Sequence, residues 1–200
     1  GASLSAYDVV NLMFSPDTGA SFEAAAPGKL RLAPGPNQRR VILCSRSGRL
    51  KKAQSRYPGK ILRRHFNAEA IDGMAKRATS LEEMIGLMIA DAEDNGVLVK
   101  PDLVKHPYAG CRNVEDVTAR AAELLGFDIE EALSPETGAN FMVDYLADAQ
   151  FDIWDLFARK KLTEQDELRY RQLIESPYLC WGAPCPIPTA QKILALIEAG

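Results

Sequence analysis

The sequence has little histidine and cysteine, and no long apolar run. Only two histidines and four cysteines occur among its 200 residues, too few cysteines for a disulfide scaffold at a length that buries roughly 70% of the unfolded surface. No apolar run approaches the 18 residues of a membrane span, and the run at residues 6–14 contains Asp8, unlike a secretory signal. We therefore expect a cytoplasmic or otherwise intracellular protein with no signal peptide, transmembrane segment or membrane partner.

The common catalytic motifs are also missing. The sequence contains no GxxxxGK[ST], GxGxxG, HExxH or GxSxG, which removes the usual starting points for P-loop, dinucleotide-binding, zincin and hydrolase enzymes. Two histidines leave few general bases. These absences favour a non-enzymatic protein, and an enzyme acting on a phosphorylated substrate stays open as an alternative.

Acidic residues are absent from residues 24–68. This stretch holds twelve of the 24 Lys and Arg residues, so its formal charge is +12, whereas the rest of the chain combines the other twelve with all 27 acidic residues and carries −15. The overall charge of −3 hides a polarised chain. We place a domain boundary where the sign changes, between a basic N-terminal region (residues 1–66) and an acidic all-helical domain (residues 67–200).

Helical periodicity dominates the acidic domain. Helix starts are expected at Ser80, Asn113, Ser134, Thr163 and Pro188. Gly96 and Gly126 are expected to end the first two of these helices. The pattern predicts a mainly α fold, with a bundle-like body of about six helices.

The N-terminal region reads as partly β or irregular. A short helix is expected at residues 7–14, followed by a hairpin that pairs residues 30–32 with residues 41–44. Residues 49–56 are expected to form a helical turn or two. This region therefore contributes little regular structure and most of the positive charge.

The strongest functional signal is a basic segment at residues 39–64. Cations without neighbouring carboxylates suit phosphate contacts, and aromatic rings can stack on bases. The predicted contacts are Arg39, Arg40, Arg46, Arg49, Lys51, Lys52, Arg56, Lys60, Arg63 and Arg64, with Tyr57 and Phe66 as stacking platforms. The first hypothesis is an accessory or structural protein that binds nucleic acid, RNA or DNA, or another polyanion.

An acidic stripe supports a different hypothesis. On one continuous helix, Asp144, Asp148, Asp152 and Asp155 would share a face. Such a stripe can hold Mg²⁺ with substrate phosphates, receive a basic partner, or form a solvated face. If the basic segment docks on it, within the chain or on a neighbour, the protein is a helical scaffold or self-assembling interaction module, with a homo-oligomer or another protein as partner.

Two loops have the spacing of zinc half-sites. His106 and Cys111 are separated by four residues, as are Cys180 and Cys185, and Zn²⁺ accepts a Cys₃His set. If the loops meet, they would form a structural zinc site, and the alternative is that these side chains are simply buried. We expect no other cofactor.

Overall fold

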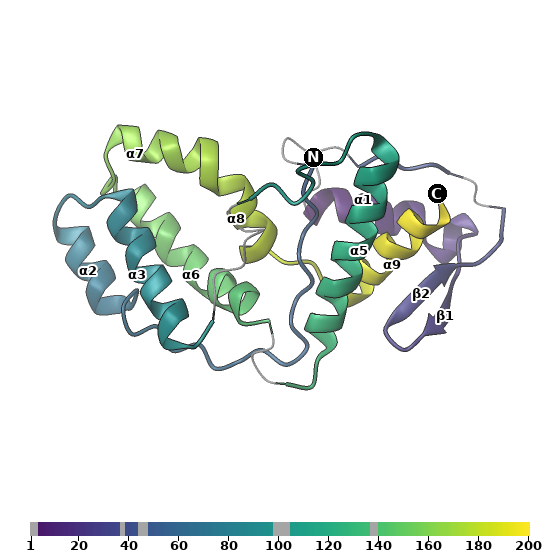
Figure 1. Cartoon of the computed structure of the whole chain (residues 1–200), viewed down its shortest axis with the longest axis horizontal. Coiled ribbons are helices and arrows are strands. Elements are labelled where there is room, and N and C mark those ends of the chain that lie inside the picture. Colours follow the sequence, from purple (N-terminus) through teal and green to yellow (C-terminus); the bar gives the residue numbers. More distant parts are fainter. Residues whose placement is uncertain (1–3, 37–38, 44–47, 98–104, 137–139) are drawn as a thin grey trace.

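The computed structural model describes residues 4–36, 39–43, 48–97, 105–136 and 140–200. It is mainly helical with one antiparallel two-strand hairpin, which confirms the predicted fold class. Figure 1 shows two helical lobes along the long axis of the molecule. None of the helices in these ranges combines the length and apolarity needed to cross a bilayer.

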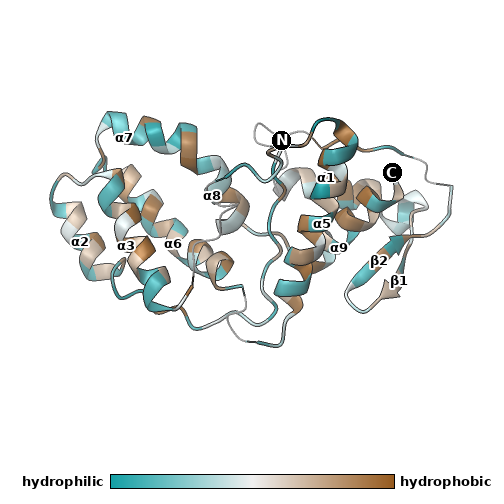
Figure 2. Ribbon diagram, viewed as in Figure 1, coloured by the Kyte–Doolittle hydropathy of each residue, from teal (hydrophilic) through white to brown (hydrophobic). Residues whose placement is uncertain are grey.

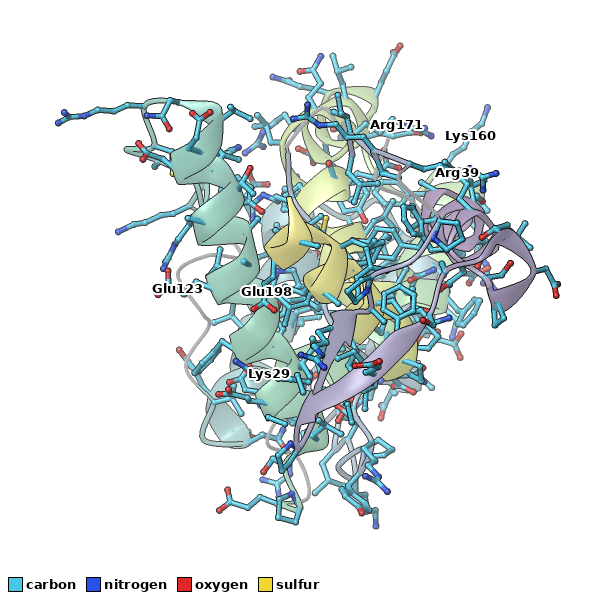
Figure 3. The ribbon with its side chains drawn as sticks, turned by 90° about the vertical axis from the view of Figure 1, so that its right-hand side faces the viewer. Lys29, Arg39, Glu123, Lys160, Arg171 and Glu198 are labelled. Atoms are coloured by element: carbon cyan, nitrogen blue, oxygen red, sulfur yellow. The ribbon has the colours of Figure 1, made fainter. Side chains whose placement is uncertain are left out.

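The first lobe lies around the two chain ends. It comprises α1 (Leu4–Met13), the 3₁₀ turn η1 (Pro16–Thr18), β1 (Phe22–Ala26), β2 (Lys29–Leu32), α5 (Val114–Leu133) and α9 (Ile187–Ala199). Helix α9 lies between the hairpin and α5. The hydrophobic core of this lobe includes Tyr7, Val10, Leu125 and Ile193. Figure 3 views the molecule from this end, with Lys29 of the hairpin and Glu198 of α9 labelled.

The second lobe is mainly helical. It comprises α2 (Ala68–Lys76), α3 (Leu81–Asp94), α6 (Phe141–Ala158), α7 (Glu164–Arg169), the π-helical turn η2 (Tyr170–Ile174) and α8 (Glu175–Gly182). Tyr145, Ile153 and Leu156 of α6 lie in its core beside Met84 and Trp181. Figure 2 shows hydrophobic and hydrophilic residues on the helices of both lobes, as amphipathic helices require.

Three predicted helix caps form hydrogen bonds. The side chains of Ser80, Asn113 and Thr163 each accept from the backbone N–H three residues later. Each bond satisfies one of the amide donors that a helix start leaves unpaired. These local signals therefore fix where α3, α5 and α7 begin.

Two predicted helix limits are wrong. Helix α5 continues past Gly126 to Leu133, because its apolar face still packs on α9 and a single helical glycine costs only about 1 kcal/mol. Ser134 then ends α5 instead of starting a new helix, with an extended ψ of 133° that suits a residue before proline. The next helix, α6, begins at Phe141.

The predicted hairpin has one correct strand, residues 30–32, but the wrong partner for it. Residues 29–32 pair with residues 22–26, with Phe22 opposite Leu32 and Glu23 opposite Arg31. The Pro27-Gly28 turn explains this register, because Gly28 adopts a φ of +77°. Residues 41–43 form no strand, Cys44 lies outside the described residues, and residues 49–56 are extended instead of helical.

The two hydrophobic cores cross the predicted domain boundary. Residues from the N-terminal region share a core with α5 and α9, and Phe66 belongs to the core of the second lobe. The domain boundary at residue 66 stays a prediction that rests on the change in charge. Residues 48–66, just before this boundary, form an extended segment that runs between the lobes (Figure 1). This segment is called the strap below.

Candidate functional site

The strap contains most of the basic segment and is bound by backbone hydrogen bonds in its first half. The amide of Lys52 donates to the Cys180 carbonyl at 2.9 Å, and its carbonyl accepts from the amide of Cys185 at 2.8 Å. The next residue, Ala53, is fully buried, and Arg56 donates its amide to the Ala132 carbonyl at 2.8 Å. These bonds join the strap to the ends of α8 and α5.

Lys52 makes a mostly buried ion pair between the lobes. Its Nζ lies 2.7 Å from Oδ1 of Asp128 on α5 and 4.2 Å from the centre of the Trp181 ring on α8. The two charged side chains are only 12% and 9% exposed. Neutralising one partner would leave the other charge in a poorly solvated position.

Two further cations of the strap face inward. Nη2 of Arg49 donates to the Lys105 carbonyl at 2.9 Å, and Nζ of Lys51 donates to the Leu179 carbonyl at 2.5 Å. Both residues are buried, and burial lowers the pKa of Lys51. In this conformation neither side chain is presented to a phosphate.

Asp91 binds the other end of the strap. Its fully buried carboxylate accepts from the amides of Arg64, His65 and Phe66 at 2.7, 2.8 and 3.0 Å. It also accepts from the Tyr145 hydroxyl at 2.9 Å. Burial and this carboxylate together raise the pKa of Tyr145, so the hydroxyl remains a donor.

Arg63 docks on the predicted acidic stripe. Helix α6 is continuous from Phe141 to Ala158, so the stripe exists. Nε of Arg63 lies 3.0 Å from Asp148, and Nη1 lies 2.5 Å from Asp152. Burial alone would lower the pKa of Arg63, but the bond to Asp152 and the two carboxylate charges raise it.

The other two aspartates of the stripe also have partners within the chain. Asp144 accepts from the amide of Gly59 at 3.1 Å, and Asp155 pairs with Arg159 within α6 at 2.8 Å. On α3, Asp94 accepts from Arg64 at 3.5 Å and lies 3.2 Å from Nε2 of His65. The strap therefore lies along carboxylates supplied by α3, α5 and α6 of its own chain.

A smaller part of the basic segment faces solvent. Arg40, Arg56, Tyr57 and Lys60 are exposed, and the Arg56 guanidinium lies 5.6 Å from the centre of the Tyr57 ring.

Two other predicted contact residues of the segment are not presented in the same way. Arg39 donates to the Met13 carbonyl at 3.0 Å and is labelled beside α1 in Figure 3. Phe66 is fully buried, so it offers no free face to a base in this conformation. Arg46 lies outside the described residues.

A small pocket opens beside the strap. Arg49, Lys52, Tyr108, Asp128, Cys180 and Trp181 are among its lining residues. Its internal volume of about 30 Å³ holds about two water molecules. The lining combines cationic, carboxylate and thiol side chains.

The four proposed zinc ligands do not form a ligand cluster. Among the residues that the structure describes, no three His, Cys, Asp or Glu side chains are grouped as a metal site would require. Cys185 is fully buried in the apolar core of the first lobe, and burial raises its pKa to about 12. Burial also raises the pKa of the Cys180 thiol, so both thiols are protonated at neutral pH in this structure.

Asp91 and Asp128 anchor the strap but are not among the predicted site residues. Each lies on the apolar face of its helix, Asp91 in line with Met84 and Met88, and Asp128 between Leu125 and Ile129. A carboxylate at a core position must find a cation or several donors. An aspartate on the apolar face of a predicted helix therefore indicates a buried polar contact.

No protein-family model matches the chain, and no curated protein matches it.

Proposed function

We propose that this chain is a non-enzymatic helical interaction module that self-assembles, with its basic segment docked on acidic helix faces of the same chain. The observation that carries the proposal is the docking of the strap. Lys52 is paired with Asp128, and Arg63 with Asp148 and Asp152. Moving these cations to an external polyanion would remove their charge from buried or half-buried carboxylates, which costs several kcal/mol for the buried pair.

Exposed apolar side chains support an interaction role. Leu12 on α1 and Phe151 on α6 are each 71% exposed. Single exposed apolar residues are common on soluble proteins, whereas neighbouring aromatic residues are enriched in protein interfaces. Phe151 has such a neighbour in Trp154.

The test measures mass and nucleic-acid affinity on the same preparation. Light scattering across protein concentration is expected to give a mass above the 22.0 kDa of one chain. Fluorescence anisotropy with single-stranded RNA and duplex DNA is expected to show no binding tighter than the nonspecific range, about 10⁻⁴ to 10⁻⁶ M at physiological salt. A monomer at every concentration, or tight binding that Arg63→Glu weakens, would contradict the proposal.

The exposed part of the basic segment supports nucleic-acid binding as a second candidate function. Arg56 lies within cation–π distance of Tyr57, and Lys60 and Arg40 are also exposed. Such an arrangement suits contacts to a phosphate and an unstacked base. Lys60→Glu should weaken RNA affinity and reduce the salt dependence by roughly one phosphate contact. Lys76→Glu, at an exposed position on α2, is the matched control, and equal loss in both variants would leave only general charge attraction.

A further inference from the structure

Helix α6 presents a row of residues to solvent with alternating spacings of three and four. The row consists of Asp144, Ala147, Phe151, Trp154 and Ala158. Side chains at this spacing lie along one side of a helix. The centre of the row is open, since Phe151 and Trp154 are 71% and 44% exposed, and their rings meet edge to face with centres 5.8 Å apart.

The row has nearly the same pattern when read from either end. An acidic residue and an alanine precede the aromatic pair, and an alanine follows it, with Arg159, Lys160 and Lys161 directly after the end of the helix. A two-fold axis between the aromatic residues would therefore place unlike charges together, small residues together and aromatic residues together. Such self-complementarity is what an isologous interface requires.

We propose that two copies of this chain associate through this row, with α6 packed antiparallel against α6 of the second copy. The proposal rests on the self-assembly proposed above and names its interface. Phe151 would pack on Trp154 of the partner subunit, and Ala147 on Ala158 of the partner subunit. The alanines allow the two helices to approach closely, and the aromatic residues supply most of the buried apolar area.

The charges at the two ends of α6 favour the antiparallel arrangement. Asp144 and Asp148 lie in its first half, whereas Arg159, Lys160 and Lys161 follow its last residue. An antiparallel pair sets the carboxylates of one copy opposite the cations of the other, and a parallel pair would set like charges together. Arg63 contacts Asp148 but leaves its side chain 51% exposed, so this carboxylate is still accessible to a second cation.

The strap meets the row at Asp144, which accepts from the amide of Gly59, and leaves the aromatic centre of the row exposed. Its contacts to α6 through Arg63 reach Asp148 and Asp152, and Asp152 lies about 100° around the helix from Phe151. The strap therefore lies along one side of the row, and Phe151 and Trp154 remain accessible to a second copy of the chain.

The first test compares two exposed apolar residues. Phe151→Ser should raise the dimer dissociation constant roughly tenfold or more in sedimentation equilibrium, as expected at the centre of an interface. Leu173→Ser removes an equally exposed residue in η2 and should leave the constant unchanged. Circular dichroism checks that both variants fold. A dimer that is insensitive to Phe151→Ser overturns this interface but keeps self-assembly, whereas a monomeric wild-type chain contradicts self-assembly itself.

The second test fixes the direction and register. Ala147→Cys and Ala158→Cys are made separately in a Cys111→Ser background and mixed under mild oxidation with diamide. The antiparallel register brings the two new thiols together only in the mixture, because in either variant alone they would be about 17 Å apart along the helices, beyond disulfide reach. Equal cross-linking of each variant alone would indicate a parallel pair and overturn the proposal.

Discussion

At the scale of single residues, the strap depends on a few carboxylates placed on otherwise apolar helix faces. Asp91 accepts four hydrogen bonds, three of them from consecutive backbone amides. A carboxylate supplies enough lone pairs for four donors, whereas an amide supplies half as many and adds two donors of its own. Asp91 thus holds residues 64–66 in a conformation that no regular element provides.

Asp91→Asn is therefore expected to destabilise the protein by about 3 kcal/mol in urea unfolding, because the new amide leaves buried donors unpaired. Asp94→Asn is the matched control on the same helix. Asp94 is 39% exposed and pairs with Arg64 and His65, so its loss should cost under about 1 kcal/mol. Equal losses in the two variants would show that burial of Asp91 is unimportant.

Residue types alone could not separate the inward cations from the outward ones. Lys51 and Lys60 are equivalent in the sequence, yet Lys51 is buried against the Leu179 carbonyl and Lys60 is exposed. The difference depends on contacts 128 residues apart along the chain. The stripe on α6 was predictable because it is periodic within one helix, whereas its partner Arg63 was not.

At the scale of elements, local signals placed most helices and failed where tertiary packing decides. Ser80 and Thr163 cap α3 and α7 as predicted. Gly126 did not end α5, since its neighbours on the same helix pack against α9. The hairpin partner was wrong because residues 41–43 are more β-like than residues 22–26, yet only the latter adjoin the Pro27-Gly28 turn.

Two helical glycines should respond oppositely to alanine. At Gly86, an exposed position in α3, an added Cβ meets nothing within 4 Å, so Gly86→Ala should stabilise the protein by about 0.5 to 1 kcal/mol through helix propensity. At Gly182 the Cβ would lie 3.0 Å from the Leu146 carbonyl oxygen and from Cε1 of Tyr178. Gly182→Ala should therefore cost about 1 to 3 kcal/mol. Thermal unfolding of both variants checks the sign, and a gain in both would contradict the close approach of α8 to α6.

At the scale of the whole molecule, the strap joins two separate cores. Its backbone bonds to Cys185 and Ala132 belong to the first lobe, and Phe66 and Asp91 belong to the second. The net charge of −3 gave no indication of this arrangement, in which the basic segment neutralises carboxylates of both lobes. The distribution of charge along the sequence indicated the basic segment and the acidic helices. Only the fold shows that cations of the segment face inward, toward those helices.

The Lys52 to Asp128 pair should make the two lobes unfold together. Lys52→Met leaves the Asp128 carboxylate buried without its cation and is expected to cost about 3 to 5 kcal/mol. Asp128→Asn added to Lys52→Met removes the remaining charge and should recover most of that loss, because a neutral pair is far cheaper to bury. Wild-type transitions followed by far-ultraviolet circular dichroism and by tryptophan fluorescence should coincide. In Lys52→Met they should separate, since Trp181 contacts Lys52 across the joint. A double variant as unstable as Lys52→Met would show that packing of the lysine stem, and not its charge, joins the lobes.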